Sequence, residues 1–580
     1  MNGNKKLIIL ALVLLVAVFG VLTACKGLKD GDGETVVVTD ENGVPITDEN
    51  GEAMTVVLQT QIVEVTNENG EKVYDENGKV KTSVVYIPQE VGIPVTDENG
   101  QPVTDADGNR VTTMITVPPT TDGPTTSIVP VTDENGEYVT DENGETVTSV
   151  ITSPNTPATP GSNNSNWGAT FGGSGNDHFV DTAALSDGGF VALLQSNSKD
   201  GSMSALAGNS ATPIPVLIKY KKNGTIAWQK AISSDNGIVV SGLAVDKEDN
   251  IAVSGYTKSK NLGFTNAGDY DAVLFKFNDR GDLQWQQGFG GSLTDGFEAV
   301  AAAPDGGFVA VGYSSSSDGT GASLGLSPAH AASVVVKYGA DGTLQFMKSV
   351  GSTGDSLTDV AIDKNGNIYA VGNVSARDDY KLFAGFGRTD AAVIKFSANG
   401  DVQWVKQYGG SDIENFPAIT AASDGGCVIA GRSKSKDHTL ASLSNHGKFD
   451  AILVKYNDDG AVVWERGFRG FEDDSFTDIV QTEDGGYAAV GYSGSSNRDL
   501  KPIGNRGGLD GFVVTVTAAG RVNSVQGYGG SRDDRFNALC ILKSGQIIAC
   551  GSTLSTDGDL VGSGAQSDGK TTVGMIARFN

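Results

Sequence analysis

GGSLTDGFEAVAAAPDGGFVAVGYSSSS, the stretch Gly290–Ser317, contains two short apolar runs joined by a tight turn. The first run, Phe297–Ala302, consists mostly of small apolar residues. The second, Phe308–Tyr313, is rich in the β-branched and aromatic residues typical of strands. Asp305-Gly306-Gly307 lies between them, and glycine supplies the positive φ that a tight turn requires. The stretch therefore predicts a β-hairpin.

Two further strands precede this hairpin. Asp271–Phe277 is a β-rich run, Asn278–Gly281 is a turn, and Leu283–Phe289 is a second run that carries Trp285. Sustained helical periodicity is confined to the first 22 residues of the chain. Each unit thus reads as four antiparallel strands, which we name a, b, c and d, with strand a first.

The unit recurs seven times between residues 167 and 580. The apolar position that opens strand a repeats at spacings of 61, 57, 60, 59, 60 and 60 residues. Its seven occupants are Phe179, Val240, Phe297, Leu357, Phe416, Phe476 and Phe536. Four-stranded repeats are typical of propeller blades, and rings of about four to eight blades are usual. We therefore predict an all-β fold, a seven-bladed β-propeller with strand a nearest the axis.

The two ends of the repeat region distinguish a closed ring from an open solenoid of stacked repeats. Trp167–Gly173 matches strand d with no strand c before it, and Met575–Asn580 matches strand c with no strand d after it. Together they complete one blade. Pairing of the two ends would close the ring and leave no exposed sheet edge.

The recurring pattern GGSxxDxF…DGGFVAVGYxxS…DAxxxKxxxxGxxxW resembles the bacterial SBBP-type β-propeller repeat, over roughly residues 167–580. The resemblance implies the fold. It implies no single function, because this family occurs on surface and secreted proteins with varied roles. One unit departs most, with Ile232–Asp235 in place of GGS and Glu248–Asn250 in place of DGG, and two others carry Phe346 and Ser524 instead of tryptophan. We expect these blades to be less regular.

The start of the chain predicts its location. Lys5 and Lys6 precede an apolar run, Leu7–Leu22, that is shorter than the ~20 residues of a spanning helix. Leu22-Thr23-Ala24-Cys25 then resembles a bacterial lipobox, which implies that residues 1–24 are a lipoprotein signal peptide and that Cys25 is lipidated. The alternative is a retained transmembrane anchor. We expect an extracytoplasmic protein, anchored by lipid to the bacterial cell membrane and exposed at the cell surface.

Residues 25–166 predict an acidic, low-complexity stalk. VTDENG or VTNENG begins at Val38, Val65, Val95 and Val131, and residues 26–166 hold 25 acidic against 6 basic residues. Asn-Gly between Thr/Val-rich arms could form hairpins, but isolated two-stranded hairpins are marginal in water. We favour a disordered spacer, since a coil of this length spans roughly 60–70 Å.

An acidic residue recurs two positions before the strand-a apolar residue. The set is Asp177, Asp295, Asp355, Glu414, Asp474 and Asp534. Six acids at the mouth of a central channel could gather a cation or a polar ligand. The interpretation we favour is that each carboxylate accepts hydrogen bonds from the neighbouring glycine amides and closes the d–a turn.

The long, varied b–c loops form the preferred candidate binding surface. Because strand direction alternates, they share one face of the ring with the d–a turns. Variable loops on a rigid scaffold are where binding sites are usually built. Their aromatic residues, expected to be exposed, are Phe264, Tyr270, Tyr380, Phe383, Phe386 and Phe449. The alternative is that these rings fill gaps between blades.

Net charge and residue types argue against some classes of function. The chain carries a net charge of −28 and no basic stripe, which disfavours nucleic acid as a partner. Its four histidines, His178, His330, His438 and His446, show no metal-ligand spacing, so we expect neither a metal nor a cofactor. We expect a monomeric, non-enzymatic module that binds a surface protein or glycan. The alternatives are a hydrolase or lyase at the channel mouth and a scaffold without a ligand. Whether Cys540 and Cys550 form a disulfide stays open.

Overall fold

The structure is a computed structural model. It describes residues 167–580 except 265–267, 327–330, 352–355, 376–385, 444, 562 and 565–566, together with seven strands between residues 34 and 152. Two compact units can be distinguished, Met1–Thr152 and Ser153–Asn580. Among the described residues no helix is long and apolar enough to cross a membrane.

The described part of the first unit consists of short antiparallel strands. β1, β2 and β3 form one sheet, β4 pairs with β5, and β6 pairs with β7. Their bounds are β1 (Glu34–Val37), β2 (Thr55–Glu64), β3 (Thr82–Ile87), β4 (Gln89–Pro94), β5 (Thr112–Val117), β6 (Thr126–Pro130) and β7 (Thr148–Thr152). The predicted signal peptide, Cys25 and the remainder of the predicted stalk lie outside the described residues.

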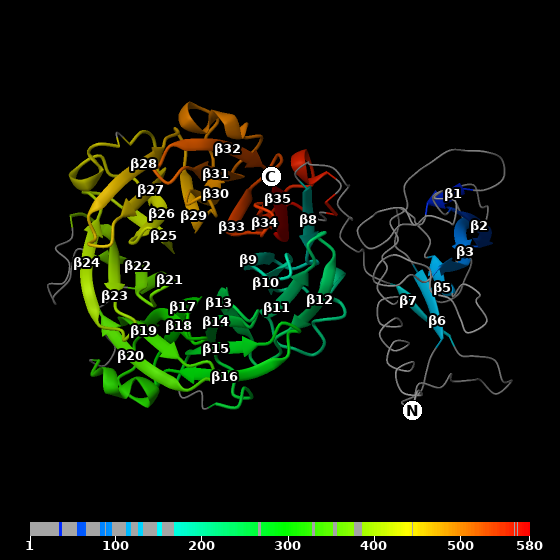
Figure 1. Ribbon diagram of the computed structural model, residues 1–580, viewed down its shortest axis with the longest axis horizontal. Helices are drawn as coiled ribbons and strands as arrows, with labels where there is room; N and C mark the ends of the chain where they lie inside the picture. Colours follow the sequence, from blue (N-terminus) through cyan, green and yellow to red (C-terminus); the bar gives the residue numbers. More distant parts are fainter. Residues whose placement is uncertain are drawn as a thin grey trace, which may run out of the picture. The chain divides into compact units, whose positions relative to one another are not determined.

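The second unit is a ring of seven four-stranded antiparallel sheets, as the sequence predicts (Figure 1). Strand a of each blade lies nearest the centre, and strand d lies at the rim. Short 3-10 helices occur in five of the b–c loops: η1 (Gly201–Met203), η2 (Gly319–Leu324), η3 (His438–Leu440), η4 (Arg498–Ile503) and η5 (Gly558–Leu560).

The strand bounds follow the repeat. Blade 1 consists of β9 (Asp177–Ala184), β10 (Phe190–Ser196), β11 (Ile214–Tyr220) and β12 (Ile226–Ala231). Blade 2 consists of β13 (Ile238–Val245), β14 (Ile251–Thr257), β15 (Asp271–Phe277) and β16 (Leu283–Phe289). Blade 3 consists of β17 (Asp295–Ala302), β18 (Phe308–Ser314), β19 (Ala332–Tyr338) and β20 (Leu344–Val350). Blade 4 consists of β21 (Ser356–Ile362), β22 (Ile368–Ser375), β23 (Thr389–Phe396) and β24 (Val402–Tyr408). Blade 5 consists of β25 (Glu414–Ala421), β26 (Cys427–Ser433), β27 (Asp450–Tyr456) and β28 (Val462–Phe468). Blade 6 consists of β29 (Asp474–Gln481), β30 (Tyr487–Ser493), β31 (Asp510–Val516) and β32 (Val522–Tyr528). Blade 7 consists of β33 (Asp534–Ile541), β34 (Ile547–Thr553), β35 (Val573–Phe579) and β8 (Trp167–Phe171).

Blade 7 closes the ring. Its strand c, β35, pairs antiparallel with β8, so that Gly574 lies opposite Phe171 and Arg578 lies opposite Trp167. The predicted pairing of the two ends of the repeat region is therefore confirmed.

The apolar core lies between neighbouring blades. All seven residues of β15 are buried, because sheets stack on both of its faces, and such strands read as continuous apolar runs. At the junction of blades 2 and 3, the ring of Phe297 stacks on that of Phe289 with centroids 5.6 Å apart. Small residues in strand a leave room for seven strands to meet around the axis.

A tryptophan in strand d joins each of four blades to the next. Trp285 donates a hydrogen bond of 3.0 Å to the carbonyl oxygen of Ala340, in the c–d turn of the following blade. Its ring lies on Gly342, where an added Cβ would come within 3.0 Å of the indole. Trp228, Trp404 and Trp464 make the same link. Blade 6 has Ser524 instead, and the next blade has no c–d turn because its strands β35 and β8 come from distant parts of the chain.

We expected the blades that depart from the repeat pattern to be less regular. For strand pairing this expectation is wrong. In the blades with Phe346 and Ser524, strands c and d pair with the same register shift as elsewhere. In blade 2, Asp249 adopts a φ of 61°, a conformation that glycine supplies at the DGG turns. Phe346 covers Gly400 of the next blade as the tryptophans do. The substituted residues thus keep the backbone pattern.

The three described cysteines are buried and free. Cys540 lies opposite Ile548 and Cys550 lies opposite Ala538, so the two thiols are diagonal neighbours on paired strands. Burial raises the pKa of Cys540 to about 12, which keeps this thiol protonated and unreactive.

Candidate functional site

The recurrent acids at the start of strand a are held in buried cages. Asp295 accepts hydrogen bonds from the Gly291 amide at 2.9 Å and from the hydroxyls of Ser314 and Ser316 at 2.5 and 2.7 Å. Asp177, Glu414, Asp474 and Asp534 accept equivalent hydroxyl hydrogen bonds from the end of strand b. These five carboxylates are fully buried. We therefore assign them to turn closure instead of a channel-mouth site; Asp355 lies outside the described residues.

Blade 2 shows what the cage hydroxyls do without an acid. Ile238 occupies the acidic position there and is buried. Thr257 and Ser259 instead donate to the Gly237 carbonyl oxygen at 2.7 and 3.3 Å. The hydroxyl pair at the end of strand b thus has a structural role with or without the acid.

The b–c loops and d–a turns form one interlocked face. At blade 3, the Ser292 amide donates to Asp318 Oδ1 at 2.7 Å, and the Thr320 amide donates to the Gly290 carbonyl oxygen at 2.9 Å. The same two contacts recur beside η1, η3 and η5. The described b–c loops are therefore tied down by backbone hydrogen bonds, as a presentation scaffold requires.

The aromatic residues of these loops are less exposed than predicted. Phe264 packs over Gly288 against the core between blades 1 and 2. Tyr270 meets Tyr256 edge-on at 5.3 Å and is half-buried, as is Phe449. Only Phe386, 39% exposed and stacked on His438, is an exposed ring among the four that the structure describes. Tyr380 and Phe383 lie outside the described residues. For Phe264 the gap-filling alternative is the correct one.

A row of arginine and aromatic side chains crosses blades 5, 6 and 7 on this face. The Arg432 guanidinium lies 4.5 Å from the centre of the Phe449 ring, and its Nη1 donates to Tyr492 Oη at 3.0 Å. The Arg535 guanidinium lies 4.8 Å from the centre of the Tyr492 ring. We call Phe449, Arg432, Tyr492 and Arg535 the arginine–aromatic row. It joins three blades. Blade 2 carries a related contact at the equivalent positions, where the Lys258 ammonium group lies 4.2 Å from the centre of the Tyr270 ring.

The cations of this row are only weakly neutralised. Within the described part of the chain, Arg432 makes no ion pair, and Arg535 pairs only with Asp533 at 3.8 Å. Lys434 adds a third cation, 5.9 Å from the centre of the Phe449 ring. A guanidinium stacked on a ring is held in place, and its in-plane N–H groups can still bind carboxylate or phosphate. The row thus combines fixed donors with aromatic surface.

The sequence analysis named Phe449 as a candidate but missed the other three residues of this row, although a signal was present. Residues 167–580 contain 12 arginines, and 9 of them lie at or beyond Arg432, in blades 5–7. This uneven distribution distinguishes blades 5–7 from the rest of the ring.

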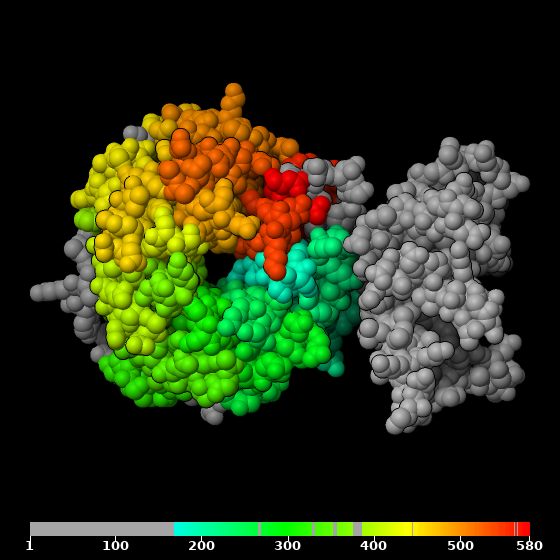
Figure 2. Space-filling view, viewed as in Figure 1, coloured from blue at the N-terminus to red at the C-terminus, as the bar shows by residue number. Residues whose placement is uncertain are grey.

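The central channel carries a second set of acids, from strand a of blades 1, 4 and 6. Figure 2 shows the opening at the centre of the ring. Asp181 accepts the amides of Thr182 and of Leu243 in the next blade, both at 2.7 Å. Asp359 and Asp478 likewise each accept one amide hydrogen bond from their own blade and one from the next blade. Each carboxylate therefore clamps a pair of blades.

The protonation of these channel acids is perturbed. Burial, followed by the charge of Asp478, raises the pKa of Asp181 to about 8. Burial raises the pKa of Asp478 to about 6 and that of Asp359 well above its ordinary value. Such shifts mark candidate functional groups, but buried structural carboxylates show them too. Two amide hydrogen bonds to each carboxylate favour a structural role.

Comparisons with known proteins identify no family for this chain. No protein-family model matches the chain. A stretch of 157 residues is 27% identical to the regulatory protein FlaEY of Caulobacter vibrioides, covering 25% of this chain and 16% of that protein. The chain thus matches less than a fifth of that protein's length.

Solved structures are similar at low sequence identity. A protein of unknown function from Dyadobacter fermentans is 12% identical with a TM-score of 0.37, covering 71% of this chain and 98% of that chain. A gluconolactonase from Xanthomonas campestris is 11% identical with a TM-score of 0.30, covering 65% and 93%. A Hadza microbial sialidase is 11% identical with a TM-score of 0.32, covering 61% and 65%. At this level of similarity no activity or ligand is transferred.

Proposed function

We propose that this chain is a lipid-anchored bacterial surface protein whose b–c loop face binds a protein or a glycan. The observation that carries the proposal is the arginine–aromatic row. Arg432 and Arg535 stack on rings, lack close carboxylate partners in the described part of the chain, and lie on a face fixed by backbone hydrogen bonds. Binding surfaces are enriched in arginine and aromatic residues for these reasons.

The proposed location rests on the start of the chain. The resemblance of Leu22–Cys25 to a lipobox supports attachment through Cys25, and the acidic composition of residues 26–166 supports a spacer between membrane and propeller.

The proposal is tested on arrays of bacterial cell-wall glycans and of surface proteins with the purified full-length chain. The double variant Arg432→Ala/Arg535→Ala removes both stacked guanidinium groups. Arg521→Ala is the matched control, since Arg521 is an exposed arginine in the c–d turn of blade 6, on the opposite face. Circular dichroism and thermal unfolding verify that each variant folds.

We expect the affinity of the double variant to fall at least about tenfold, because one or two charge-assisted hydrogen bonds are lost. The control variant should bind as the parent does. Equal binding by the double variant and the parent would move the site off this row. An absence of binding on both arrays would refute the proposed function and leave the scaffold alternative.

A further inference from the structure

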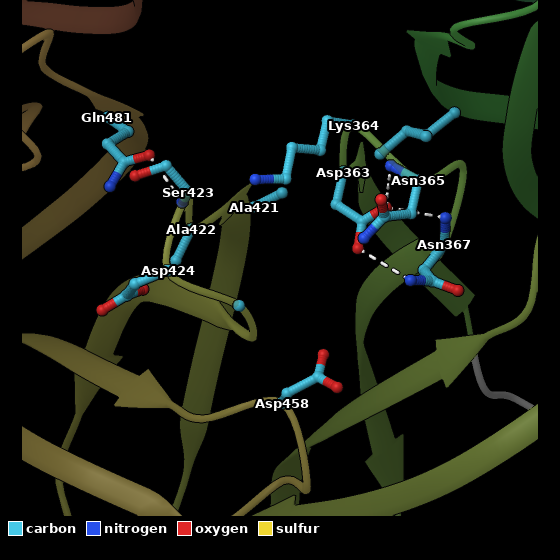
Figure 3. A pocket seen from close by; sticks show the side chains of 12 residues that line it. Asp363, Lys364, Asn365, Asn367, Ala421, Ala422, Ser423, Asp424, Asp458 and Gln481 are labelled. Carbon is cyan, nitrogen blue, oxygen red and sulfur yellow. Dashed lines mark hydrogen bonds between the residues drawn. The ribbon is translucent and has the colours of Figure 1, made fainter.

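A cavity of about 500 Å³ lies on the other face of the ring, where the a–b and c–d turns gather. It lies between the a–b turns of blades 4 and 5, next to the c–d turn of blade 5 (Figure 3). Lys364 extends into it from one wall, and Asp424 and Asp458 lie along the other side and the floor. Its volume is in the range of small-molecule sites.

Blade 4 departs from the repeat beside this cavity. In blade 3 the strand-c lysine pairs with the acid of its own DGG turn, as Lys337 does with Asp305 at 2.5 Å. Blades 1 and 5 make the same pair. Blade 4 has Asn365 at that turn position, and Lys395 bonds instead to Asp458 of blade 5, at 2.5 Å.

Small side chains keep the facing wall open. Ala421, Ala422 and Ser423 line it, and the Ser423 amide donates to Gln481 Oε1 at 2.9 Å, which fixes the turn. On the other wall Asp363 accepts the amides of Asn365 and Asn367 at 2.8 and 2.9 Å. Both walls are thus preorganised by hydrogen bonds of their own.

The charges around the cavity nearly cancel. Asp424 is paired with Lys455 at 2.5 Å, and Asp458 accepts from both Lys395 and the Tyr369 hydroxyl. The Lys395 hydrogen bond holds the pKa of Asp458 below its ordinary value, so this group stays ionised. Paired carboxylates offer little net attraction to an amine, and their presence disfavours an anion. Among the described residues no group of three acidic, histidine or cysteine side chains is arranged to hold a metal.

We propose that this cavity binds a neutral, hydroxyl-rich ligand, that is, a carbohydrate. Asp424 uses Oδ2 for Lys455, which leaves Oδ1 to accept a hydroxyl. Lys364 can donate, and the Asn365 amide can both donate and accept. Sugar hydroxyls are donors and acceptors at once and match such a mixed lining. This site is independent of the proposed function, since it lies on the opposite face from the arginine–aromatic row.

Two variants test the site in the full-length chain. Ser423→Tyr fills the cavity from the wall of small side chains, and Lys364→Ala removes an exposed donor with little effect on folding. Pro304→Tyr is the matched control, because Pro304 is the exposed residue at the equivalent turn position of blade 3. The probes are glucose, galactose, N-acetylglucosamine and lactose, with spermidine and glucuronate as charged contrasts. Binding is followed by saturation-transfer NMR and by the shift in Tm.

We expect at least one neutral sugar to bind the parent and the Pro304→Tyr control. The same sugar should lose binding to Ser423→Tyr and bind Lys364→Ala at least about tenfold more weakly. Undiminished binding to Ser423→Tyr would place the sugar elsewhere and overturn the inference. Preferential binding of spermidine or glucuronate would overturn the assigned ligand class, and the absence of any sugar binding would overturn the site. None of these outcomes depends on variants of Arg432 or Arg535.

Discussion

The indole nitrogen of Trp404 donates a hydrogen bond of 2.9 Å to the backbone carbonyl oxygen of Asp458, and thereby joins the rim of blade 4 to the c–d turn of blade 5. The ring rests on Gly460, where an added Cβ would come within 3.0 Å of it. Gly460 makes room for the Trp404 ring, and the ring in turn shields the c–d turn.

Replacing Trp404 by alanine should lower the free energy of unfolding by about 2 kcal/mol, less than the 3–5 kcal/mol of a fully buried tryptophan. Chemical denaturation with the slope held in common measures the change. Ser524→Ala is the control at the equivalent position of blade 6, where no c–d turn follows; it removes only the 2.7 Å hydroxyl contact with Thr515 and should cost no more than about 1 kcal/mol. Equal effects at both positions would show that the Trp–turn link contributes nothing.

The buried cages predict a larger cost. Asp295→Ala should destabilise the chain by about 2–4 kcal/mol, because the Gly291 amide and two serine hydroxyls lose their buried acceptor. Thermal unfolding at constant scan rate measures it. The exposed Asp279→Ala serves as comparison. A loss no greater than that of the comparison would contradict the assignment to turn closure.

Stability should fall as pH rises from about 4 to about 8. Burial raises the folded-state pKa of Asp181 to about 8, of Asp474 to about 7 and of Asp478 to about 6. The folded chain therefore holds more protons than the unfolded chain in this window, where unperturbed aspartates have lost theirs. The contribution of these groups is complete below the unfolded value and is lost as pH rises through each folded value.

Unfolding free energies measured between pH 5 and pH 8.5 test this dependence. Asp181→Asn should show a shallower slope than the parent, since Asp181 has the highest folded-state pKa of the three. An unchanged slope would mean that Asp181 does not titrate in this range.

Cys25→Ser should release the chain from the membrane when it is expressed in a bacterium. The physical reason is that the acyl chains would supply the membrane affinity, at about 0.8 kcal/mol per buried methylene. Fractionation with a metabolic fatty-acid label measures both attachment and lipidation. The Cys427→Ser variant, at a buried cysteine of the propeller, should stay at the membrane. Retention of unlabelled Cys25→Ser would instead favour the transmembrane alternative.

The fold was predictable because the same four-strand pattern occurs seven times in the sequence. Repeat period and residue type together predict the strand order, the turn glycines and the pairing of Trp167–Phe171 with Val573–Phe579. The cages were also foreseeable, since an acid, a glycine pair and a hydroxyl pair recur at fixed offsets.

The candidate sites were not predictable in the same way, because they depend on departures from the repeat. Asn365 stands where blades 1, 3, 5 and 6 have aspartate, and Lys395 of the same blade bonds across to Asp458 beside the cavity. The contacts of Arg432 with Phe449 and Tyr492 join residues 17 and 60 positions apart, and no motif marks them. The prediction that the loop aromatic residues are exposed failed, because loop composition does not show which rings pack against glycines such as Gly288.

The pairing of β8 with β35 has a consequence for how the chain is made. The strand that completes blade 7 is the first of the ring to be synthesised, and its partner is the last. The ring therefore stays open, with an unpaired edge, until the final residues have been delivered. Contacts of such long sequence separation form slowly. If the chain is exported in an extended form, as the proposed lipid anchor would require, translocation must be complete before the propeller can close.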